Sequence, residues 1–280
     1  MGQFNATASG SRVTFDEEGD NGLVLCDRYL PVEVLIEILC RADCKTLLSC
    51  QLVCKRWKML MRHVWHKKTE RTLARPFPWS DDMSWSVFYL ACAKKPYERN
   101  LLRNHSGADS LRHWKCLLRE GHANDWVVEE PPVGVPELPP AEPLFKDRQI
   151  CFATSFAWCN KAQTVVLAKE GVHPYILDTY QPPIVVSEWY SCRWDCPAVY
   201  QLEVRLYNSD NLVMDTFEFN DVLEGEKQNQ WLKVSHVFEN YGPGLDTIYF
   251  EHRGKDRAFW AGNYGSKMAG ACVYVKIPGQ

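Results

Sequence analysis

The chain has 280 residues, of which 46% are hydrophobic, and it carries a formal net charge of -3. This length accommodates a small module beside a larger domain, and the hydrophobic content supports packed cores rather than wholesale disorder. A net charge so close to neutral argues against electrostatic binding of nucleic acid, and no apolar run is long enough to predict a transmembrane segment.

Residues 1–23 are polar and rich in Gly, Ser, Asp and Glu, which predicts a disordered segment. They contain no apolar stretch of the kind that a secretory signal needs, so we expect a cytoplasmic protein. In a reducing compartment the twelve cysteines would be free thiols. None of them forms a C-x-x-C pair, and Cys192 and Cys196 are four residues apart, so we expect cysteines packed in cores and no metal or cofactor.

Three short helices are predicted within residues 24–71. Pro31 stands in the first turn of "LPVEVLIEILCRAD", where its missing N–H costs nothing, and Asp43 is placed as the N-cap of "CKTLLSCQLVC". A third segment, "KRWKMLMRHVWHKKTE", puts its apolar residues on one stripe (Trp57, Leu60, Met61 and Val64). A module of this size barely sustains a core alone, so we expect it to need a partner.

The rest of the chain predicts a helical linker over residues 72–96 and a larger domain over residues 97–280. A proline-rich passage, "VVEEPPVGVPELPPAEP", indicates extended backbone that is either a solvated linker or draped over a domain, in preference to a recognition motif. From about residue 150, short β-branched and aromatic runs alternate with turn signals. Seven or more such runs without long helices predict an antiparallel β-sandwich, and the fold class is therefore α+β multidomain.

The helical module resembles an F-box. Residues 30–57, "LPVEVLIEILCRADCKTLLSCQLVCKRW", contain the opening Leu-Pro, the Leu-x-x-Ile-Leu run and the closing Leu-Val-Cys-x-x-Trp at the family's intervals. The resemblance implies that the module binds Skp1 and, through it, cullin-1 and the RING subunit of a ubiquitin ligase. Six residues would then be anchors in a groove of Skp1 (Leu30, Pro31, Ile38, Leu47, Leu48 and Val53). The alternative is that these side chains pack the three helices together.

Residues 97–280 resemble the F-box-associated domain of the sugar-recognising F-box proteins. The matching stretches are "NLLRN", "ATSFAWCNKAQ", "LDTYQPPIVVSEWYSCRWDC", "YGPG" and "FEHRGKDRAFWAGNYG". The resemblance implies a β-sandwich and a non-catalytic role as the substrate adaptor of a Skp1–cullin-1–F-box ubiquitin ligase. Its clients would be misfolded N-glycosylated proteins in ER-associated degradation, which places it in the cytoplasm and at the cytosolic face of the ER.

In glycan-binding members of that family, one aromatic residue of an early loop and an aromatic–Trp pair of a late loop form the pocket. The matching residues here are Phe156, Phe259 and Trp260, so the resemblance implies that they bind high-mannose N-glycans. A flat ring can receive the C–H face of a sugar while polar groups nearby fix its orientation. The alternative is that the three aromatic residues close one end of the sandwich.

This chain departs from the glycan-binding pattern at three places in the late loop. Ala261 stands where relatives can carry Lys, Asn263 stands where an aromatic residue is frequent, and residues 266–271 read "SKMAGA" where relatives often read Arg-Val-Thr-Asn-Ser-Ser. Fewer or different polar groups therefore lie beside the expected stacking ring. Two further hypotheses stay open: an adaptor that recognises a protein degron without glycan, and an F-box protein that acts outside a ligase.

No catalytic motif is found. The sequence has no His-x-x-x-His, no Gly-x-Ser-x-Gly and no phosphate-binding loop, so we expect no catalytic residue. Cys159 is expected to be a packed cysteine behind the early loop. We interpret His252 as a strand histidine that a neighbouring group satisfies, and we expect Asp256 and Arg257 to shape the turn before the aromatic pair.

Overall fold

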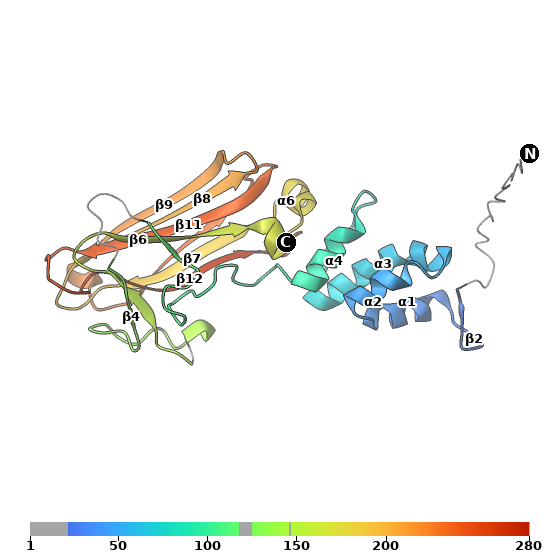
Figure 1. Ribbon diagram of the computed structural model, residues 1–280, viewed down its shortest axis with the longest axis horizontal. Helices are drawn as coiled ribbons and strands as arrows, with labels where there is room; N and C mark the ends of the chain where they lie inside the picture. Colours follow the sequence, from blue (N-terminus) through green and yellow to red (C-terminus); the bar gives the residue numbers. More distant parts are fainter. Residues whose placement is uncertain (1–21, 118–124, 146, 280) are drawn as a thin grey trace, which may run out of the picture. The chain divides into compact units, whose positions relative to one another are not determined.

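The structure is a computed structural model that describes residues 22–117, 125–145 and 147–279, and its contacts divide the chain into two units, Met1–Arg75 and Pro76–Gln280 (Figure 1). The first unit begins with a short hairpin and continues with three helices. Its elements are β1 (Val24–Leu25), β2 (Arg28–Tyr29), α1 (Val32–Arg41), α2 (Cys44–Cys50) and α3 (Lys55–Leu73).

The three predicted helices are present, and the predicted cap of the second helix is confirmed. The Asp43 carboxylate accepts hydrogen bonds from the backbone N–H groups of Lys45 and Thr46 at 2.9 and 3.0 Å, which satisfies two donors that the first turn leaves open. The core of the unit is apolar and comes from all three helices (Leu35, Leu39, Leu47, Met61, Val64 and Trp65).

Most of the segment that we predicted to be disordered, residues 1–23, lies outside the described residues. Its last two residues are described, and they pack against the helical unit. Leu23 is buried, and the indole N–H of Trp57 donates a hydrogen bond to the carbonyl oxygen of Gly22 at 2.7 Å. The chain that enters the helical unit is therefore fixed from Gly22 onward.

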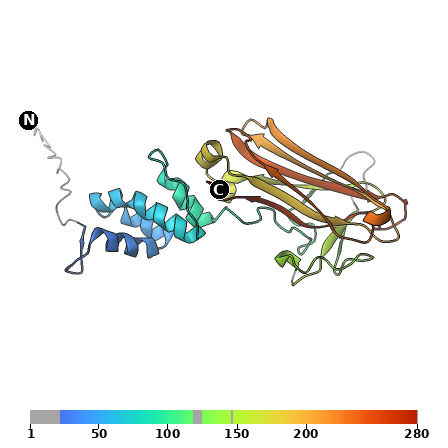
Figure 2. The ribbon, with the colours of Figure 1, turned by 180° about the vertical axis from the view of Figure 1, so that it is seen from behind.

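The second unit contains two five-stranded antiparallel sheets that form a sandwich (Figures 1 and 2). This arrangement confirms the predicted β-sandwich. One sheet has the strand order β10-β7-β12-β5-β4, and the other has the order β3-β6-β11-β8-β9. The strands are β3 (Lys115–Cys116), β4 (Val127–Glu129), β5 (Cys151–Ala153), β6 (Cys159–Val166), β7 (Ile184–Ser191), β8 (Ala198–Asn208), β9 (Val213–Leu223), β10 (Leu232–Phe238), β11 (Leu245–Asp256) and β12 (Lys267–Val275).

Strand β8 shows how the sequence pattern builds the sandwich. Its even-numbered residues from Tyr200 to Leu206 are at most 1% exposed, whereas the odd-numbered residues between them are partly exposed. Because successive side chains of a strand point to opposite faces, the apolar set of "YQLEVRLY" fills the space between the sheets. The alternation that the sequence shows is thus the alternation of burial.

The short helices of the second unit lie outside the two sheets. They are α4 (Trp85–Lys94), η1 (Pro143–Phe145), α5 (Leu167–Glu170), α6 (Pro174–Tyr180) and η2 (Gly225–Lys227). Helix α4 lies in the segment predicted as a linker and contacts this unit through Ser86, whose hydroxyl is 3.1 Å from Nε2 of His173. Residues 110–117 form turns and strand β3, in which Lys115 and Cys116 pair with β6.

The proline-rich passage is draped over the sandwich. Strand β4 pairs with β5, and Leu138 is fully buried in a cluster with Phe145, Cys151 and Ala269. The indole N–H of Trp231 also donates to the carbonyl oxygen of Pro136 at 2.9 Å. Of the two interpretations of this passage, packing against the domain is therefore the one that holds.

A hydrogen-bonded group of buried polar side chains joins the two sheets. Nδ1 of His252 on β11 lies 2.6 Å from a carboxylate oxygen of Glu188 on β7, and the hydroxyl of Tyr200 donates to the other oxygen at 2.6 Å. The imidazole stacks on Trp114 with ring centres 4.5 Å apart. His252 is therefore a strand histidine that a neighbouring group satisfies at Nδ1, whereas its Nε2 is buried without a hydrogen-bond partner among the described residues.

Burial also raises the pKa of several cysteine thiols. All twelve are free thiols, and Cys159, Cys192 and Cys196 are fully buried. Burial raises the pKa of Cys192 to about 12 and that of Cys196 to about 11, because the thiolate would lose its hydration. Cys159 packs behind the early loop, as expected, and accepts a hydrogen bond from the backbone N–H of Ser155 at 3.5 Å.

Candidate functional site

Four loops meet at one end of the sandwich, the left end in Figure 1. The strand register places them there, because Asp256 pairs with Ala198, Gly254 pairs with Cys159, and Lys267 pairs with both Ala153 and Ser191. The connections that leave these strand ends are residues 154–158, 192–197, 224–231 and 257–266. The early and the late loop of the sequence, about 100 residues apart, thus come from the same end.

Backbone hydrogen bonds tie the late loop to its neighbours at its base. The N–H of Asp256 donates to the carbonyl oxygen of Ser155 at 3.0 Å, and the N–H of Gly265 donates to that of Thr154 at 2.9 Å. On the other side, the N–H of Arg257 donates to the carbonyl oxygen of Pro197 at 2.9 Å. Residues 257–264 therefore project from a fixed base between the early loop and residues 192–197.

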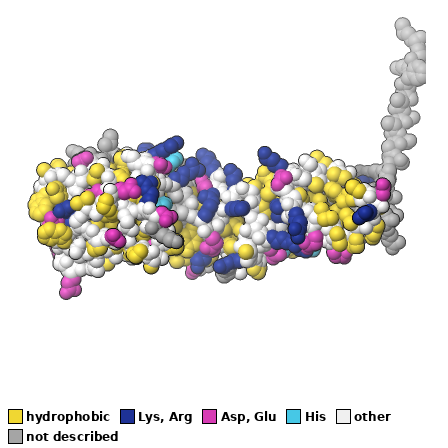
Figure 3. All heavy atoms as spheres, turned by 90° about the horizontal axis from the view of Figure 1, so that it is seen from below, with side chains coloured by type: hydrophobic (Ala, Val, Ile, Leu, Met, Phe, Trp, Pro, Cys, Tyr) yellow, Lys and Arg dark blue, Asp and Glu magenta, His cyan; other side chains and the backbone are white. Residues whose placement is uncertain are grey.

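The three predicted aromatic residues all expose ring surface on these adjoining loops. The exposed fractions are 41% for Phe156, 73% for Phe259 and 42% for Trp260. Trp260 packs edge to face on Tyr264, with ring centres 5.6 Å apart. Figure 3 shows hydrophobic side chains gathered on this end of the sandwich. The large aromatic residues of a glycine-rich loop thus present an apolar surface to water.

Asp256 shapes the turn before the aromatic pair, as the sequence predicted. Its side chain is fully buried, and Oδ1 accepts a hydrogen bond from the backbone N–H of Phe259 at 2.7 Å. Phe259 has a φ of +55°, a left-handed conformation that residues other than glycine rarely adopt. The buried carboxylate therefore holds the loop in the conformation that exposes the Phe259 ring.

The three departures from the family pattern have different places in the structure. Ala261 is exposed and adds no polar group to the loop. The amide of Asn263 donates to the carbonyl oxygen of Asp125 at 2.7 Å and so anchors the loop to the chain before β4. The tail from Ser266 to Ala271 is buried at the start of β12, so its changed residues lie in the core rather than at the exposed rings.

A lysine is nevertheless present beside the aromatic rings. The ammonium of Lys255 lies 5.9 Å from the ring centre of Phe259 and 5.0 Å from that of Trp158. A cation at this range is attracted by the face of an aromatic ring, and its N–H groups can donate to oxygen atoms of a ligand. Lys255 comes from β11, two residues before the turn, and sequence reasoning did not single it out.

In the helical unit, the six predicted partner-facing residues divide by burial. Pro31 is exposed, the exposed fractions of Ile38 and Val53 are 46% and 62%, and Leu30 and Leu48 are partly buried. Leu47 is different, since it is completely buried between the helices. For Leu47 the packing alternative holds, because a side chain in this core has no surface to offer to a partner.

Sequence reasoning missed Leu52 in the same unit. Leu52 is 82% exposed and lies in the turn between α2 and α3, next to Val53. Met59 is also 57% exposed. The predicted second helix, "CKTLLSCQLVC", extends to Cys54, whereas α2 ends at Cys50 and leaves Leu52 and Val53 in a turn.

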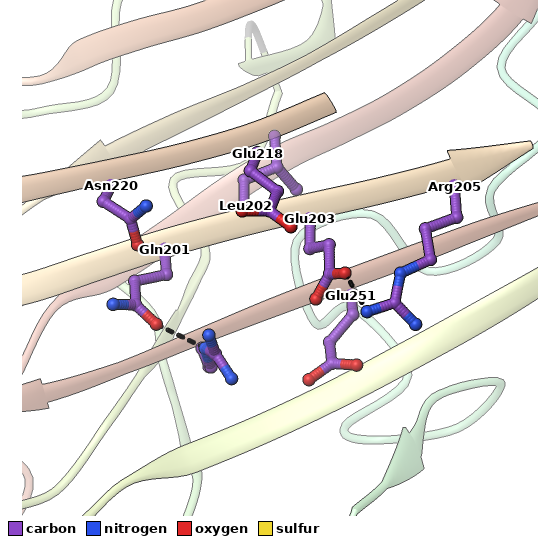
Figure 4. Close-up of a pocket in the computed structure, with 8 residues that line it drawn as sticks. Gln201, Leu202, Glu203, Arg205, Glu218, Asn220 and Glu251 are labelled. Atoms are coloured by element: carbon purple, nitrogen blue, oxygen red, sulfur yellow. Dashed lines mark hydrogen bonds and ion pairs between the residues drawn. The ribbon is translucent and has the colours of Figure 1, made fainter. Parts of the chain in front are cut away.

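A separate hollow of about 280 Å³ lies on the outer face of β8, β9 and β11 (Figure 4). Its floor carries a cross-strand row of carboxylates, since Glu203 pairs with Glu251 on one side and with Glu218 on the other. Arg205 forms an ion pair with Glu203, and Arg253 donates to Gln201. None of the predicted site residues lines this hollow.

Two kinds of site are not found in the described part of the chain. No group of three or more His, Cys, Asp or Glu side chains there could hold a metal ion. Among the described helices, none has the length and apolar character that crossing a membrane requires.

A family model matches each of the two units. A model described as F-box-like matches residues 28–71, and a model described as F-box associated region matches residues 92–275. The chain belongs to the F-box only proteins that carry an F-box associated region. The first match contains β2, α1, α2 and most of α3, and the second contains the complete sandwich with the four end loops.

Curated relatives of this F-box only protein match over most of their own length. F-box only protein 6 of Rattus norvegicus is 35% identical over 88% of this chain and 85% of the relative. F-box only protein 2 of Bos taurus is 34% identical, with 96% and 90% of the two chains covered. F-box only protein 44 of Homo sapiens is 32% identical, with 89% and 96% covered.

Solved structures match this F-box only protein much more weakly. TmCBM61 in complex with beta-1,4-galactotriose matches with a TM-score of 0.38 and 12% identity, over 64% of this chain and 98% of that chain.

Proposed function

We propose that this F-box only protein is the substrate-recognition subunit of a Skp1–cullin-1–F-box ubiquitin ligase and that its sandwich binds high-mannose N-glycans. Its clients would be misfolded glycoproteins that reach the cytosolic face of the ER for degradation. The chain itself would do no chemistry. It would hold a client at high effective concentration near the conjugating enzyme that the RING subunit recruits.

The observation that carries the glycan proposal is the exposure of Phe156, Phe259 and Trp260 on adjoining loops. A pyranose ring has C–H groups on its face and hydroxyl groups at its edge, so it fits an aromatic surface with polar groups beside it. Lys255 is such a polar group at the Phe259 ring. In this arrangement Trp260 receives the face of an N-acetylglucosamine of the inner core, and Phe156 closes the other side.

The adaptor proposal rests on the apolar surface of the helical unit. Ile38, Leu52 and Val53 expose 46%, 82% and 62% of their surface, although each is a large apolar residue. Exposed apolar residues at the ends of neighbouring short helices suit the groove of a partner. We propose that Skp1 covers them, together with Leu30, Pro31 and Leu48.

Capture of glycoproteins by the full chain, co-expressed with Skp1, tests the proposal. Removing an aromatic anchor of a binding site often costs at least about 2 kcal/mol, or roughly thirtyfold in affinity. Trp260→Ala should therefore abolish capture of high-mannose glycoproteins while Skp1 still co-purifies. Trp85→Ala is the matched control, because Trp85 is 44% exposed on α4, away from the four loops.

Treatment of the clients with an N-glycan amidase separates the remaining hypotheses. Loss of capture after treatment supports glycan recognition. Capture that survives treatment favours an adaptor for a protein degron, which the exposed apolar rings could also serve. Absence of Skp1 from the purified material would contradict the adaptor role itself, and absence of any binding of the wild-type chain to chitobiose at millimolar concentration would contradict the glycan site.

A further inference from the structure

The loop of residues 192–197 touches the aromatic loop of the proposed site. The guanidinium carbon of Arg193 lies 4.9 Å from the ring centre of Tyr264, and that ring in turn packs on Trp260. The hydrogen bond from the N–H of Arg257 to Pro197 joins the two loops a second time. Residues 192–197 are thus continuous with the surface that carries Trp260.

The backbone of this loop is held from several sides. The N–H of Trp194 donates to the carbonyl oxygen of Gly134 at 3.2 Å, and the amide of Gln228 donates to the carbonyl oxygens of Arg193 and Trp194 at 3.1 and 3.2 Å. Gly134 itself has a φ of +71°, and a Cβ atom there would lie 2.9 Å from the Arg193 guanidinium. These contacts hold the backbone of the loop at Arg193 and Trp194.

The side chain of Trp194 is exposed in spite of that support. Its exposed fraction is 64%, the second largest after Phe259 among the exposed Phe, Trp and Tyr residues of the four end loops. A tryptophan ring contributes most to the free energy of binding when a ligand covers it. A rigid loop that exposes this ring to water is therefore suited to bind a ligand. The fixed backbone means that little conformational entropy is lost on binding.

Charged residues precede and follow Trp194 in the sequence. Nε and Nη2 of Arg193 each donate to an oxygen of Asp195 at 2.8 Å, and the two side chains are 16% and 20% exposed. Paired in this way, Arg193 still has N–H groups to donate and Asp195 still has lone pairs to accept hydrogen bonds from hydroxyl groups. An aromatic face with donors and acceptors beside it is the chemistry that recognises a sugar ring rather than an apolar peptide side chain.

We propose that Trp194 is a second stacking platform of the proposed glycan site and receives a sugar ring beyond the one at Trp260. The inference rests on the proposed function, and it makes the ligand an oligosaccharide longer than chitobiose. Trp260 and Phe156 hold the inner N-acetylglucosamine rings. Trp194, with Arg193 and Asp195, holds a mannose of the core that follows them.

Calorimetric titration of the full chain in complex with Skp1 tests whether Trp194 and Trp260 bind different sugar rings of one glycan. The three probes are free chitobiose, the free trimannosyl-chitobiose core, and a glycopeptide that carries this core. Trp194→Ala should weaken binding of the longer glycan by roughly tenfold and change chitobiose binding less than about twofold. Trp194→Phe keeps a flat ring and should restore most of the loss. Trp260→Ala should weaken binding of all three probes, and Trp85→Ala should weaken none.

The other outcomes are interpreted for variants whose melting temperature equals that of the wild type. If Trp194→Ala binds both glycans like the wild type, or weakens both equally, Trp194 is not a second platform, although the proposed function stands. If it weakens only a glycopeptide and not the free glycan, Trp194 contacts polypeptide and the inference is overturned. If the wild-type chain binds neither glycan, the proposed function fails and the second platform fails with it.

Discussion

A hydrogen bond from Phe259 to the buried carboxylate of Asp256 fixes the exposed aromatic loop. The carboxylate accepts the N–H of Phe259 at 2.7 Å, and the backbone N–H of Asp256 is itself bound to Ser155. Because Phe259 sits at a φ of +55°, the loop needs a contact of this kind to keep its conformation. The fully buried side chain of Asp256 thus determines the loop conformation that exposes the Phe259 ring.

Replacing Asp256 should weaken ligand capture without removing any aromatic ring. Asp256→Ala loses a hydrogen bond to a charged acceptor and should lower the free energy of unfolding by about 1.5–3 kcal/mol. Asp256→Asn keeps an oxygen acceptor in place and should retain most of both stability and capture. Thermal melts and glycoprotein pull-downs measure the two effects. Full capture by Asp256→Ala would show that the loop keeps its conformation without this contact.

Gly265 should not tolerate a side chain. A Cβ atom there would lie 2.3 Å from the Thr154 hydroxyl oxygen and 2.9 Å from backbone atoms of Asp256 and Ser155. The backbone would have to move, so Gly265→Ala should destabilise the protein by about 1–3 kcal/mol and separate the early from the late loop. Ala261→Ser, at an exposed position of the same loop, is the control. A wild-type melting temperature for Gly265→Ala would contradict this packing.

Substitution of one buried and one exposed leucine in the helical unit should affect stability and Skp1 binding separately. Leu47 is fully buried, so Leu47→Ala should lower the free energy of unfolding by about 2–5 kcal/mol. Leu52 is 82% exposed, so Leu52→Asp should change stability by less than about 0.5 kcal/mol and yet reduce co-purification of Skp1. Chemical unfolding measures the stability of both variants, and affinity purification measures how much Skp1 each one retains. Unchanged Skp1 binding by Leu52→Asp would exclude this residue from the interface.

Acid should destabilise the sandwich through His252. Burial lowers the pKa of His252 from 6.5 to about 4, and the nearby Lys161 acts in the same direction, while Glu188 opposes them. Between these pH values the unfolded chain binds a proton that the folded chain does not. The contribution of His252 to stability is therefore complete above pH 6.5 and is lost as the pH falls to about 4, with a slope of up to about 1.4 kcal/mol per pH unit.

Melting temperatures from about pH 8 to about pH 4 check this dependence. His252→Gln keeps a donor for Glu188 but cannot take up the proton, so its stability should fall less steeply over the same range. The imidazole resonances of His252 in the wild type should also titrate with a midpoint at about pH 4. A midpoint near 6.5 for His252 would contradict the burial of its ring between the sheets.

Alkylation should distinguish the cysteines by burial. Cys26 is exposed, whereas Cys192 and Cys196 are buried with pKa values raised to about 12 and about 11. Since the thiolate is the reactive form, iodoacetamide at about pH 7.5 should label Cys26 and spare the other two in the folded protein. Mass spectrometry of peptides reads out each site, and labelling after unfolding is the control. Rapid labelling of Cys192 in the native state would mean that this end of the sandwich opens.

Local structure and family membership follow from the amino-acid sequence alone. Helix caps and hydrophobic periodicity depend on neighbouring residues, so the Asp43 cap and the alternation of β8 could both be predicted from their own segments. The family motifs also named Phe156, Phe259 and Trp260, because each stands within a short pattern of its own. Such features depend on residues only a few positions apart.

Which side chains meet, and which face water, depends instead on the tertiary fold. Gly265 binds Thr154 and His252 binds Glu188 across long stretches of chain, and no local pattern encodes these pairs. The burial of Leu47 also depends on the tertiary fold. Its helical spacing fits a buried or an exposed side chain equally well, and the packing of α3 over α2 decides between them. Trp194 lies in a turn without periodicity, so its exposure beside the aromatic loop follows only from strand register. Burial depends on what other segments cover, and that is a property of the folded chain.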